Sequence, residues 1–378
     1  MLEHTPITHT GRDVDRHASR LARLRDVLTA AGVDGVVLAP GTDLRYLAGY
    51  DALAQERPTL LLVPATGPVT LVAPRLERAR AAVEVRLPSF TLLTYGEHDD
   101  ALAAAAAALD LPDGAEVAVG DRTWSAFTLG LQAALPGRRW RTAAGLLAPL
   151  RQVKDADELA ALARVAGAID DVHRRVPDLL RAGRTEREVA ADLAALIREG
   201  HDSVSFVIVA SGPNAASPHH EPGERPLAHG DAVVVDIGGL LDGYGSDMTR
   251  TYAVGTPPDG FVAAYDALQA AQAAAVAAVQ PGVTAGAIDA VARDALTAAG
   301  LGDAFVHRTG HGIGLDTHEE PWILAGSDVP LTPGMAFSVE PGFYLEGRYG
   351  ARIEDIVVVT DDGVRPLNRV THDLVVVP

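Results

Sequence analysis

Hydrophobic and polar positions follow two different periods along the first 150 residues of the chain. From Val14 to Gly32, apolar residues recur every three or four positions, which predicts an amphipathic helix that ends at the glycine. Short apolar runs typical of strands and further helical stretches come next, at 35–39, 59–63, 69–73, about 75–84 and 124–135. This alternation predicts a small α/β domain over residues 1–150.

The remainder of the chain, residues 151–378, contains a weak internal repeat. Thr185 follows the end of one helical segment and has Glu188 at the spacing of a helix capping box. The same layout of glycine, threonine and new amphipathic helix returns about 99 residues later, around Thr284. Strand-like runs follow each helical pair, at 205–211, 232–238, 247–254, 335–342 and 351–359. Two related halves, each of helices followed by antiparallel strands, predict an α+β domain with pseudo-twofold symmetry.

Composition narrows the classes of function. With 378 residues, of which 48% are hydrophobic and 22% charged, the chain is long enough for two folded domains. A formal net charge of −18 argues against a nucleic-acid partner or an anionic membrane surface. The absence of cysteine excludes thiolate zinc sites and cysteine nucleophiles, so any metal must bind oxygen and imidazole ligands. The first residues lack an apolar signal core and no apolar run reaches the roughly 18 residues of a membrane span, so we expect a cytoplasmic protein.

Four acidic residues occupy repeated positions in the two halves. Asp236 ends the apolar run VVVD, and Asp247 begins the next strand-like run. In the second half, Glu340 ends FSVE and Glu354 lies in RIED. The spacings are 104 residues (236 to 340) and 107 residues (247 to 354), so the internal repeat duplicates a pair of carboxylates.

Burial of these four carboxylates requires compensating charge. Asp236 and Glu340 end apolar runs, where ionised carboxylates are costly unless they are paired or bound to a cation. Two divalent ions neutralise four negative charges, and His311, in the glycine-rich stretch RTGHGIGLDTHEEP, supplies an imidazole ligand where glycine permits close approach. Each residue alone has a plainer interpretation, because such an aspartate is usually a cap or a surface charge and such a histidine is usually structural. Five of them with internal symmetry favour a dinuclear metal site.

Several motifs give the chain a family resemblance. DIGGLLDGYGSDMTRTYAVG, RTGHGIGLDTHEEP, SVEPG and RIED together resemble the M24 metallopeptidase family of methionine aminopeptidase, aminopeptidase P and prolidase, whose fold is called pita-bread. The resemblance covers the region after about residue 155 and fills all five ligand positions in order. The earlier motifs LRYLAGY and LRQVKDADE resemble the extra domain of the prolidase, aminopeptidase P and creatinase branch. The resemblance implies a creatinase-type α/β domain over 1–150 and a pita-bread catalytic domain over 151–378.

The resemblance also implies how two divalent ions are held. Asp236 and Asp247 bind one ion, and Asp247 bridges to the other. His311 and Glu340 complete the second ion, and Glu354 bridges from the opposite side. A hydroxide between the ions would attack the substrate, with Glu340 as the acceptor of the water's proton. Mn²⁺ is the first choice of metal, while Co²⁺, Zn²⁺ and Fe²⁺ suit the same ligands.

Three histidines match family positions near the substrate. His219, preferred to its neighbour His220 because of its spacing from the first aspartate, matches a histidine that contacts the scissile peptide. His318 matches one that stabilises the tetrahedral oxyanion. His307 matches a substrate-pocket histidine of the proline-specific members. The resemblance therefore implies catalytic roles for His219 and His318 and substrate binding by His307.

Arg352 is the remaining candidate for the substrate site. It lies two residues before Glu354, so the two side chains alternate onto the same strand face, and we expect Arg352 to orient that carboxylate. The plainer alternative is a structural ion pair. Glu319 and Glu320 are expected to be supporting or surface charges rather than metal ligands.

These implied roles predict an Xaa-Pro peptidase, either a prolidase-like dipeptidase or an aminopeptidase P-like enzyme, that acts on a small peptide. Proline specificity rests on the family resemblance alone. Two alternatives stay open. One is a hydrolase of a small non-peptide amide of the osmolyte type, and the other is a non-catalytic binding protein on the same fold, which the retained ligands argue against. The resemblance also implies a homodimer.

Overall fold

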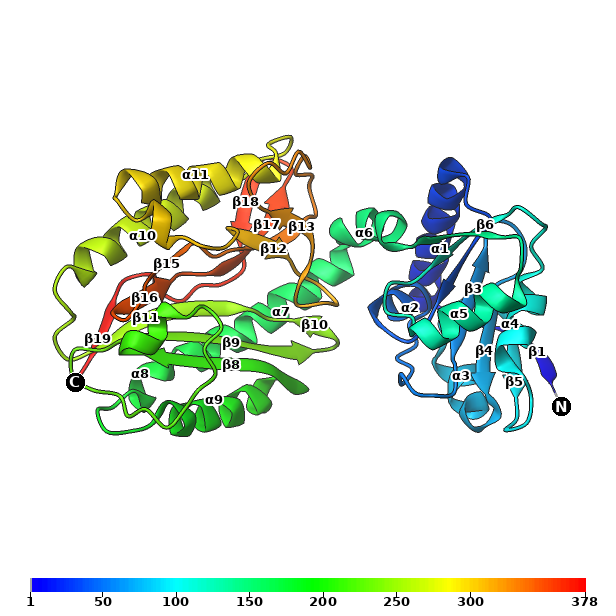
Figure 1. The fold of residues 1–378 in the computed structure, drawn as a ribbon, viewed down its shortest axis with the longest axis horizontal. Helices are drawn as coiled ribbons and strands as arrows, with labels where there is room; N and C mark the ends of the chain where they lie inside the picture. Colours follow the sequence, from blue (N-terminus) through cyan, green and yellow to red (C-terminus); the bar gives the residue numbers. More distant parts are fainter. Residues whose placement is uncertain (1) are drawn as a thin grey trace. The chain divides into compact units, whose positions relative to one another are not determined.

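Helices and strands make up both parts of the computed structural model, which describes residues 2–378 (Figure 1). The chain divides into two units, one that ends at Arg151 and one that runs from Gln152 to Pro378. Each unit has its own sheets and its own buried apolar clusters. The expected fold class, a smaller α/β unit before a larger α+β unit, is confirmed. No helix within the described residues is both long enough and apolar enough to cross a membrane.

The first unit is built on one seven-stranded sheet in the order β1-β5-β4-β3-β2-β6-β7. The predicted amphipathic helix is α1 (Arg12–Ala31), and it ends where Gly32 adopts a left-handed conformation with φ 65°. The strands are β1 (Glu3–Thr8), β2 (Gly35–Leu38), β3 (Leu60–Pro64), β4 (Thr70–Pro74), β5 (Ser89–Tyr95), β6 (Glu116–Val119) and β7 (Arg139–Thr142). The other helices are α2 (Thr42–Ala48), η1 (Arg75–Glu77), α3 (Arg78–Glu84), α4 (Ala101–Leu109), α5 (Ser125–Ala134) and α6 (Ala144–Gln152).

The first half of the second unit places helices on one face of a five-stranded sheet (Figure 1). The helix α7 packs against β9, and α9 packs against β8. The helices are α7 (Ala156–His173), α8 (Val176–Leu179) and α9 (Glu186–Gly200), with the short turn η2 (Gly212–Ala216) after β8. The strands are β8 (Ser203–Ser211), β9 (Ala232–Leu241), β10 (Tyr244–Gly245), β11 (Met248–Val254) and β19 (Val375–Val377).

The second half repeats this plan with α10 and α11 outside a second five-stranded sheet in the order β13-β12-β14-β17-β18. The helices are α10 (Phe261–Ala277), α11 (Ala285–Ala298) and the short η3 (Gly302–Ala304). The strands are β12 (Gly310–Gly312), β13 (Glu319–Ile323), β14 (Ala336–Val339), β17 (Asp355–Thr360), β18 (Gly363–Pro366) and the separate hairpin β15 (Gly342–Leu345) and β16 (Tyr349–Arg352).

The helices α9 and α11, which correspond in the two halves, begin in the same way. Thr185 caps α9, with Glu188 completing the predicted capping box, and Thr284 caps α11. Each threonine also forms an isolated bridge to a proline, Thr185 to Pro226 and Thr284 to Pro330. The repeat seen in the sequence is therefore a repeat of structure.

Alternation along the central strands turns the acidic residues away from the outer helices. In β9, Val233, Val235 and Ile237 belong to the apolar cluster that contains residues of α9. Asp236 lies between them in sequence and so points to the opposite face. In β14, Phe337 and Val339 likewise pack with residues of α10. Each half therefore presents its acidic side chains on the face opposite its own helices.

Two predicted strands are interrupted where the acidic residues lie. The run 335–342 was expected to be one strand, but β14 ends at Val339 and β15 begins at Gly342, because Pro341 has no N–H group with which to continue the ladder. The run 351–359 is also divided, because β16 ends at Arg352 and β17 begins at Asp355. Glu340 and Glu354 therefore lie at points where the chain passes from one sheet to another.

Candidate metal centre

Five side chains from both halves of the second unit meet in one cluster. Their ligand atoms lie within 4.8 Å of one another in two overlapping groups, which are Asp236 with Asp247 and Glu354, and His311 with Glu340 and Glu354. A third group joins Asp247 and His311 to a sixth residue, His318. Asp236, Asp247, His311 and Glu354 are buried, and the side chain of Glu340 is 16% exposed. The structure thus brings together all five residues that the sequence suggested as metal ligands.

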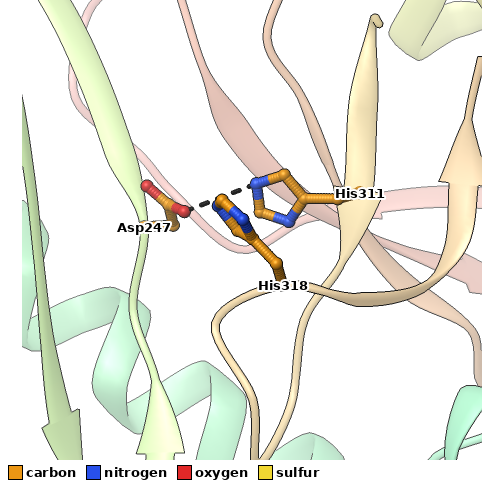
Figure 2. Close-up of side chains that lie close together, drawn as sticks. All are labelled: Asp247, His311 and His318. Carbon is orange, nitrogen blue, oxygen red and sulfur yellow. Dashed lines mark ion pairs between the residues drawn. The ribbon is translucent and has the colours of Figure 1, made fainter. Parts of the chain in front are cut away.

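Figure 2 shows how the two halves approach each other. Asp247 extends from the residue immediately before β11 on one side, and His311 extends from β12 on the other. The Oδ2 atom of Asp247 lies 3.6 Å from Nε2 of His311. His318 rises from the loop before β13, with its ring centroid 3.9 Å from that of His311, and it is exposed. His318 is therefore beside the cluster on the side that solvent reaches.

Hydrogen bonds orient the cluster from outside. His311 Nδ1 lies 3.1 Å from the carbonyl oxygen of Gly312, and donation there leaves Nε2 free to face the carboxylates, 3.1 Å from Oε1 of Glu340. Ser338 donates to the same glutamate oxygen at 2.9 Å. Thr249 donates to Oε2 of Glu354 at 2.7 Å. Glu340 is therefore held by a hydroxyl group two residues earlier on β14, and Glu354 by a hydroxyl group from β11.

The glycines around His311 are required by close backbone contacts. A Cβ atom on Gly310 would lie 1.8 Å from the carbonyl oxygen of Ser338, and one on Gly312 would lie 2.2 Å from that of Glu320. Neither distance is compatible with any side chain. The strand that carries His311 is therefore packed tightly between β13 and β14.

The charges of the cluster are not balanced by the protein alone. Burial, followed by the neighbouring carboxylates, raises the pKa values of Asp247 and Glu354 well above their usual range. Burial also raises the pKa of Asp236, against the opposing effect of Arg352. Burial opposes ionisation of Glu340 too, but its hydrogen bond and charge interaction with His311 lower its pKa to about 2. All four carboxylates can ionise together only with additional positive charge.

The donor set fits divalent cations. Oδ1 of Asp236 is buried and has no hydrogen-bond partner among the described residues. A buried carboxylate oxygen without a partner is unfavourable unless a cation completes its coordination. Carboxylate oxygens and one imidazole nitrogen suit Mn²⁺, Co²⁺, Zn²⁺ or Fe²⁺.

Arg352 differs from the expectation. Its Nη2 atom donates to Oδ2 of Asp236 at 2.6 Å, and its Nε atom donates to Oγ1 of Thr249 at 3.0 Å. Among the described residues, only Thr249 links the Arg352 side chain to the Glu354 carboxylate by hydrogen bonds. The guanidinium therefore orients Asp236 directly and Glu354 through Thr249.

The other predicted histidines line the approach to the cluster. His219 is exposed, whereas its neighbour His220 bonds to the buried Glu186 at 2.7 Å. His307 is partly buried, with Nδ1 2.7 Å from the carbonyl oxygen of Arg308 and Nε2 2.8 Å from the hydroxyl of Tyr344. Partial burial of the ring, followed by the neighbouring His311, lowers the pKa of His318 to about 4. Burial also lowers the pKa of His307, so the rings of His307 and His318 are neutral at neutral pH.

Sequence reasoning missed several residues that contact the site. Thr249 and Ser338 became relevant only through strand pairing, which the sequence does not specify. Lys154, which no motif or periodicity singled out, is buried and pairs at 2.5 Å with Glu319, the residue that follows His318. The signal that could have identified it was its position immediately before Asp155, the residue that caps α7.

Comparisons with known proteins agree with this geometry. Residues 160–361 match the model of metallopeptidase family M24, and residues 20–153 match that of the creatinase/prolidase N-terminal domain. The probable dipeptidase PepE of Mycobacterium tuberculosis is 50% identical over 97% of this chain and 98% of its own length. The Xaa-Pro dipeptidase of Pyrococcus furiosus is 30% identical over 94% of this chain and 99% of its own. The chain belongs to metallopeptidase family M24.

Solved structures define its branch of that family. The crystal structure of dipeptidase PepE from Mycobacterium ulcerans matches with a TM-score of 0.92 and 50% identity, covering 98% of this chain and all (100%) of that one. A prolidase structure from Thermococcus sibiricus matches with a TM-score of 0.90 and 34% identity, covering 97% and 100%. The chain is a peptidase of the prolidase branch, and the predicted family is confirmed.

Proposed function

We propose that this protein is a dinuclear metal-dependent dipeptidase that hydrolyses Xaa-Pro bonds. The observation that carries the proposal is the convergence of four carboxylates and His311 in a site too negative to ionise without cations. The relatives named dipeptidase and Xaa-Pro dipeptidase supply the substrate class. The aminopeptidase alternative is less favoured, since full-length relatives at 30% identity or more include dipeptidases. A homodimer and a cytoplasmic location stay predictions.

Each ligand has a distinct place in this proposal. Asp236 and Asp247 would hold one divalent ion, and His311 and Glu340 the other, with Asp247 and Glu354 shared between them. The ions would neutralise the carboxylates, polarise the scissile carbonyl and supply a water of lowered pKa. Mn²⁺ is the first choice, and the same donors suit Co²⁺, Zn²⁺ and Fe²⁺.

The remaining groups would act on protons and on the substrate. Glu340, ionised and at the edge of the cluster, would accept a proton from the attacking water. His318, exposed beside His311, would donate to the oxyanion of the tetrahedral intermediate. His219 would contact the scissile peptide, and His307 would form part of the wall of the substrate pocket. Arg352 would hold Asp236 in place from behind.

Arg308 offers a reason for preferring dipeptides. Its guanidinium stacks over the ring of Trp322 at 4.2 Å. Trp322 pairs with His311 across β12 and β13, so both side chains lie on the same face. Among the described residues, the Arg308 guanidinium has no hydrogen-bond or ion-pair partner. A cation held beside the cluster in this way would bind the free carboxylate of a dipeptide.

Arg308→Ala is therefore expected to raise the KM for Xaa-Pro dipeptides roughly 10- to 100-fold while changing kcat much less, since a charged hydrogen bond is worth about 1.5–3 kcal/mol. Steady-state kinetics with Xaa-Pro and the matching Xaa-Pro amide measures this. The variant should also lose the preference for the free acid. Arg348→Ala is a matched control, because Arg348 stacks on Tyr349 at 4.9 Å but is exposed. An unchanged KM in the Arg308 variant would remove the proposed carboxylate contact.

The proposed activity is tested directly with chelator-treated protein. Adding Mn²⁺ back is expected to restore hydrolysis of an Xaa-Pro dipeptide panel, with little cleavage of Xaa-Ala dipeptides, as measured by release of free amino acids. Elemental analysis of the same sample should give two metal ions per chain. Bound metal without cleavage of any Xaa-Pro substrate would favour a hydrolase of small non-peptide amides. A protein that binds no metal and cleaves no substrate would instead be a non-catalytic binding protein.

A further inference from the structure

Glu186, the first residue of α9, is a fully buried carboxylate that lies outside the metal cluster. Its two oxygens accept hydrogen bonds from the segment 211–223, from Ser211 N at 2.8 Å and Oγ at 2.7 Å, Asn214 Nδ2 at 3.0 Å, His220 Nε2 at 2.7 Å and Gly223 N at 3.2 Å. Although burial opposes its ionisation, these donors lower the pKa of Glu186. A charged carboxylate therefore organises this whole segment.

The same segment carries His219. Donors to Glu186 lie on both sides of this histidine in sequence, while the His219 ring itself is exposed. One residue earlier, the carbonyl oxygen of Pro218 accepts a hydrogen bond from Nη1 of Arg352 at 3.4 Å. Glu186 thus holds the segment from behind, and Arg352 ties it to the metal cluster in front.

Asp289, on α11 of the other half, has the same arrangement. It is fully buried, and its Oδ1 accepts from Thr309 N at 3.0 Å and Thr309 Oγ1 at 2.9 Å. Both of its oxygens also accept from Arg293, at 2.9 and 3.0 Å. Arg293 in turn donates to the carbonyl oxygens of Phe305 and His307, at 3.1 and 2.9 Å. This carboxylate and its arginine hold the segment that carries His307.

The two carboxylates correspond in the pseudo-symmetric fold. Glu186 is one residue beyond the capping residue Thr185, and Asp289 is five residues beyond Thr284. Positions four apart lie on the same face of a helix, one turn from each other. Equivalent helices therefore present a buried carboxylate on equivalent faces, although the sequence repeat does not align the two residues.

We propose that Glu186 and Asp289 are paired positioning residues, Glu186 for His219 and Asp289 for His307. Neither would contact the substrate, and each would act by fixing the backbone from which its histidine extends. The inference rests on the proposed function in so far as both histidines act on the substrate. A displacement of about 1 Å at a reacting group can cost on the order of 100-fold in rate, so the loss of either carboxylate should be visible in kinetics.

Double-mutant cycles on the metal-loaded protein test the pairing. Glu186→Gln is expected to lower kcat/KM for an Xaa-Pro dipeptide about 10- to 100-fold in a wild-type background and hardly at all in a His219→Ala background. It should retain its full loss in a His307→Ala background. Asp289→Asn should show the reverse pattern, so each carboxylate is the matched control for the other. Metal content should stay at the wild-type value in all variants.

Equal losses in both histidine backgrounds, or an unchanged kcat/KM, would overturn the pairing. Hydrogen–deuterium exchange gives a readout that does not depend on activity. Glu186→Gln should increase exchange in 211–223 but not in 305–309, and Asp289→Asn should do the opposite, even if no Xaa-Pro substrate is cleaved. Should Glu186→Gln not fold, Asn214→Ala removes one donor and leaves the carboxylate otherwise bonded. That variant should show the same pattern at smaller amplitude, and additive losses there would also refute the proposal.

Discussion

Asp247→Asn is expected to abolish peptidase activity, with a loss of at least about 1,000-fold, and to reduce bound metal below two ions per chain. Asp247 belongs to two of the three ligand groups, one with His311 and one with Asp236 and Glu354, so it lies where two ions would share a ligand. Asparagine keeps the size of the side chain but removes the negative charge and one carboxylate oxygen. The variant therefore cannot bridge two ions with a carboxylate, and the remaining ligands no longer balance the charge of two divalent ions.

Asp242→Asn is the matched control for this prediction. Asp242 lies five residues earlier, in the turn between β9 and β10, and its side chain is 62% exposed and paired with Arg164. Its positive φ of 53° is a conformation that asparagine also tolerates. Elemental analysis and steady-state kinetics on both variants measure the difference. Wild-type activity in the Asp247 variant, or two bound ions with no activity loss, would exclude the bridging role.

The sequence predicted elements best where one signal dominated. The helix α1 and the strands β2, β3 and β4 follow from strong periodicity and continuous apolar runs. The strands β6 and β7 have only four residues each, and β1 alternates between partly and fully exposed positions, so their apolar signals were too weak to recognise. Partners in the sheet, rather than local propensity, create these strands.

The metal ligands were predictable because they recur at repeated positions in the two halves. The residues that hold these ligands in place were not predictable. A carboxylate at the end of an apolar run in each half is visible in the sequence. The partner of Arg352 is not, because the choice between Asp236 and Glu354 depends on where β16 stops. Glu186 and Asp289 were not predicted from the sequence for a similar reason. One turn of helix separates their positions in the repeat, and only their hydrogen bonds identify them.

The uncompensated charge of the cluster has a consequence for stability. In metal-free protein, Asp247, Glu354 and Asp236 have folded-state pKa values above those of the unfolded chain, so the folded state binds more protons. Their contribution therefore falls as pH rises from about 4 through the raised values. Glu340, with its pKa lowered to about 2, contributes in the opposite direction, but only as pH falls below about 4.5.

Chelated protein is accordingly expected to lose apparent Tm as the pH rises from about 5 to 8, and added Mn²⁺ should raise the Tm most at the upper end of that range, where protons no longer compete for the ligands. At a metal concentration 100 times Kd, each ion stabilises the folded state by about 2.7 kcal/mol. Differential scanning fluorimetry with and without chelator measures both effects.

The double variant Asp247→Asn with Glu354→Gln separates this effect from the rest of the protein. It should flatten the pH dependence of the chelated protein and abolish the response to metal, because both buried charges are gone while side-chain size is retained. His17 and His173, with pKa values lowered mainly by burial to about 4 and about 3, act in the opposite sense up to about pH 6.5, and the double variant keeps both. The difference between wild type and variant therefore isolates the carboxylates. If the two proteins show the same pH slope without metal, the cluster is not under electrostatic stress, and the main physical argument for a two-ion site fails.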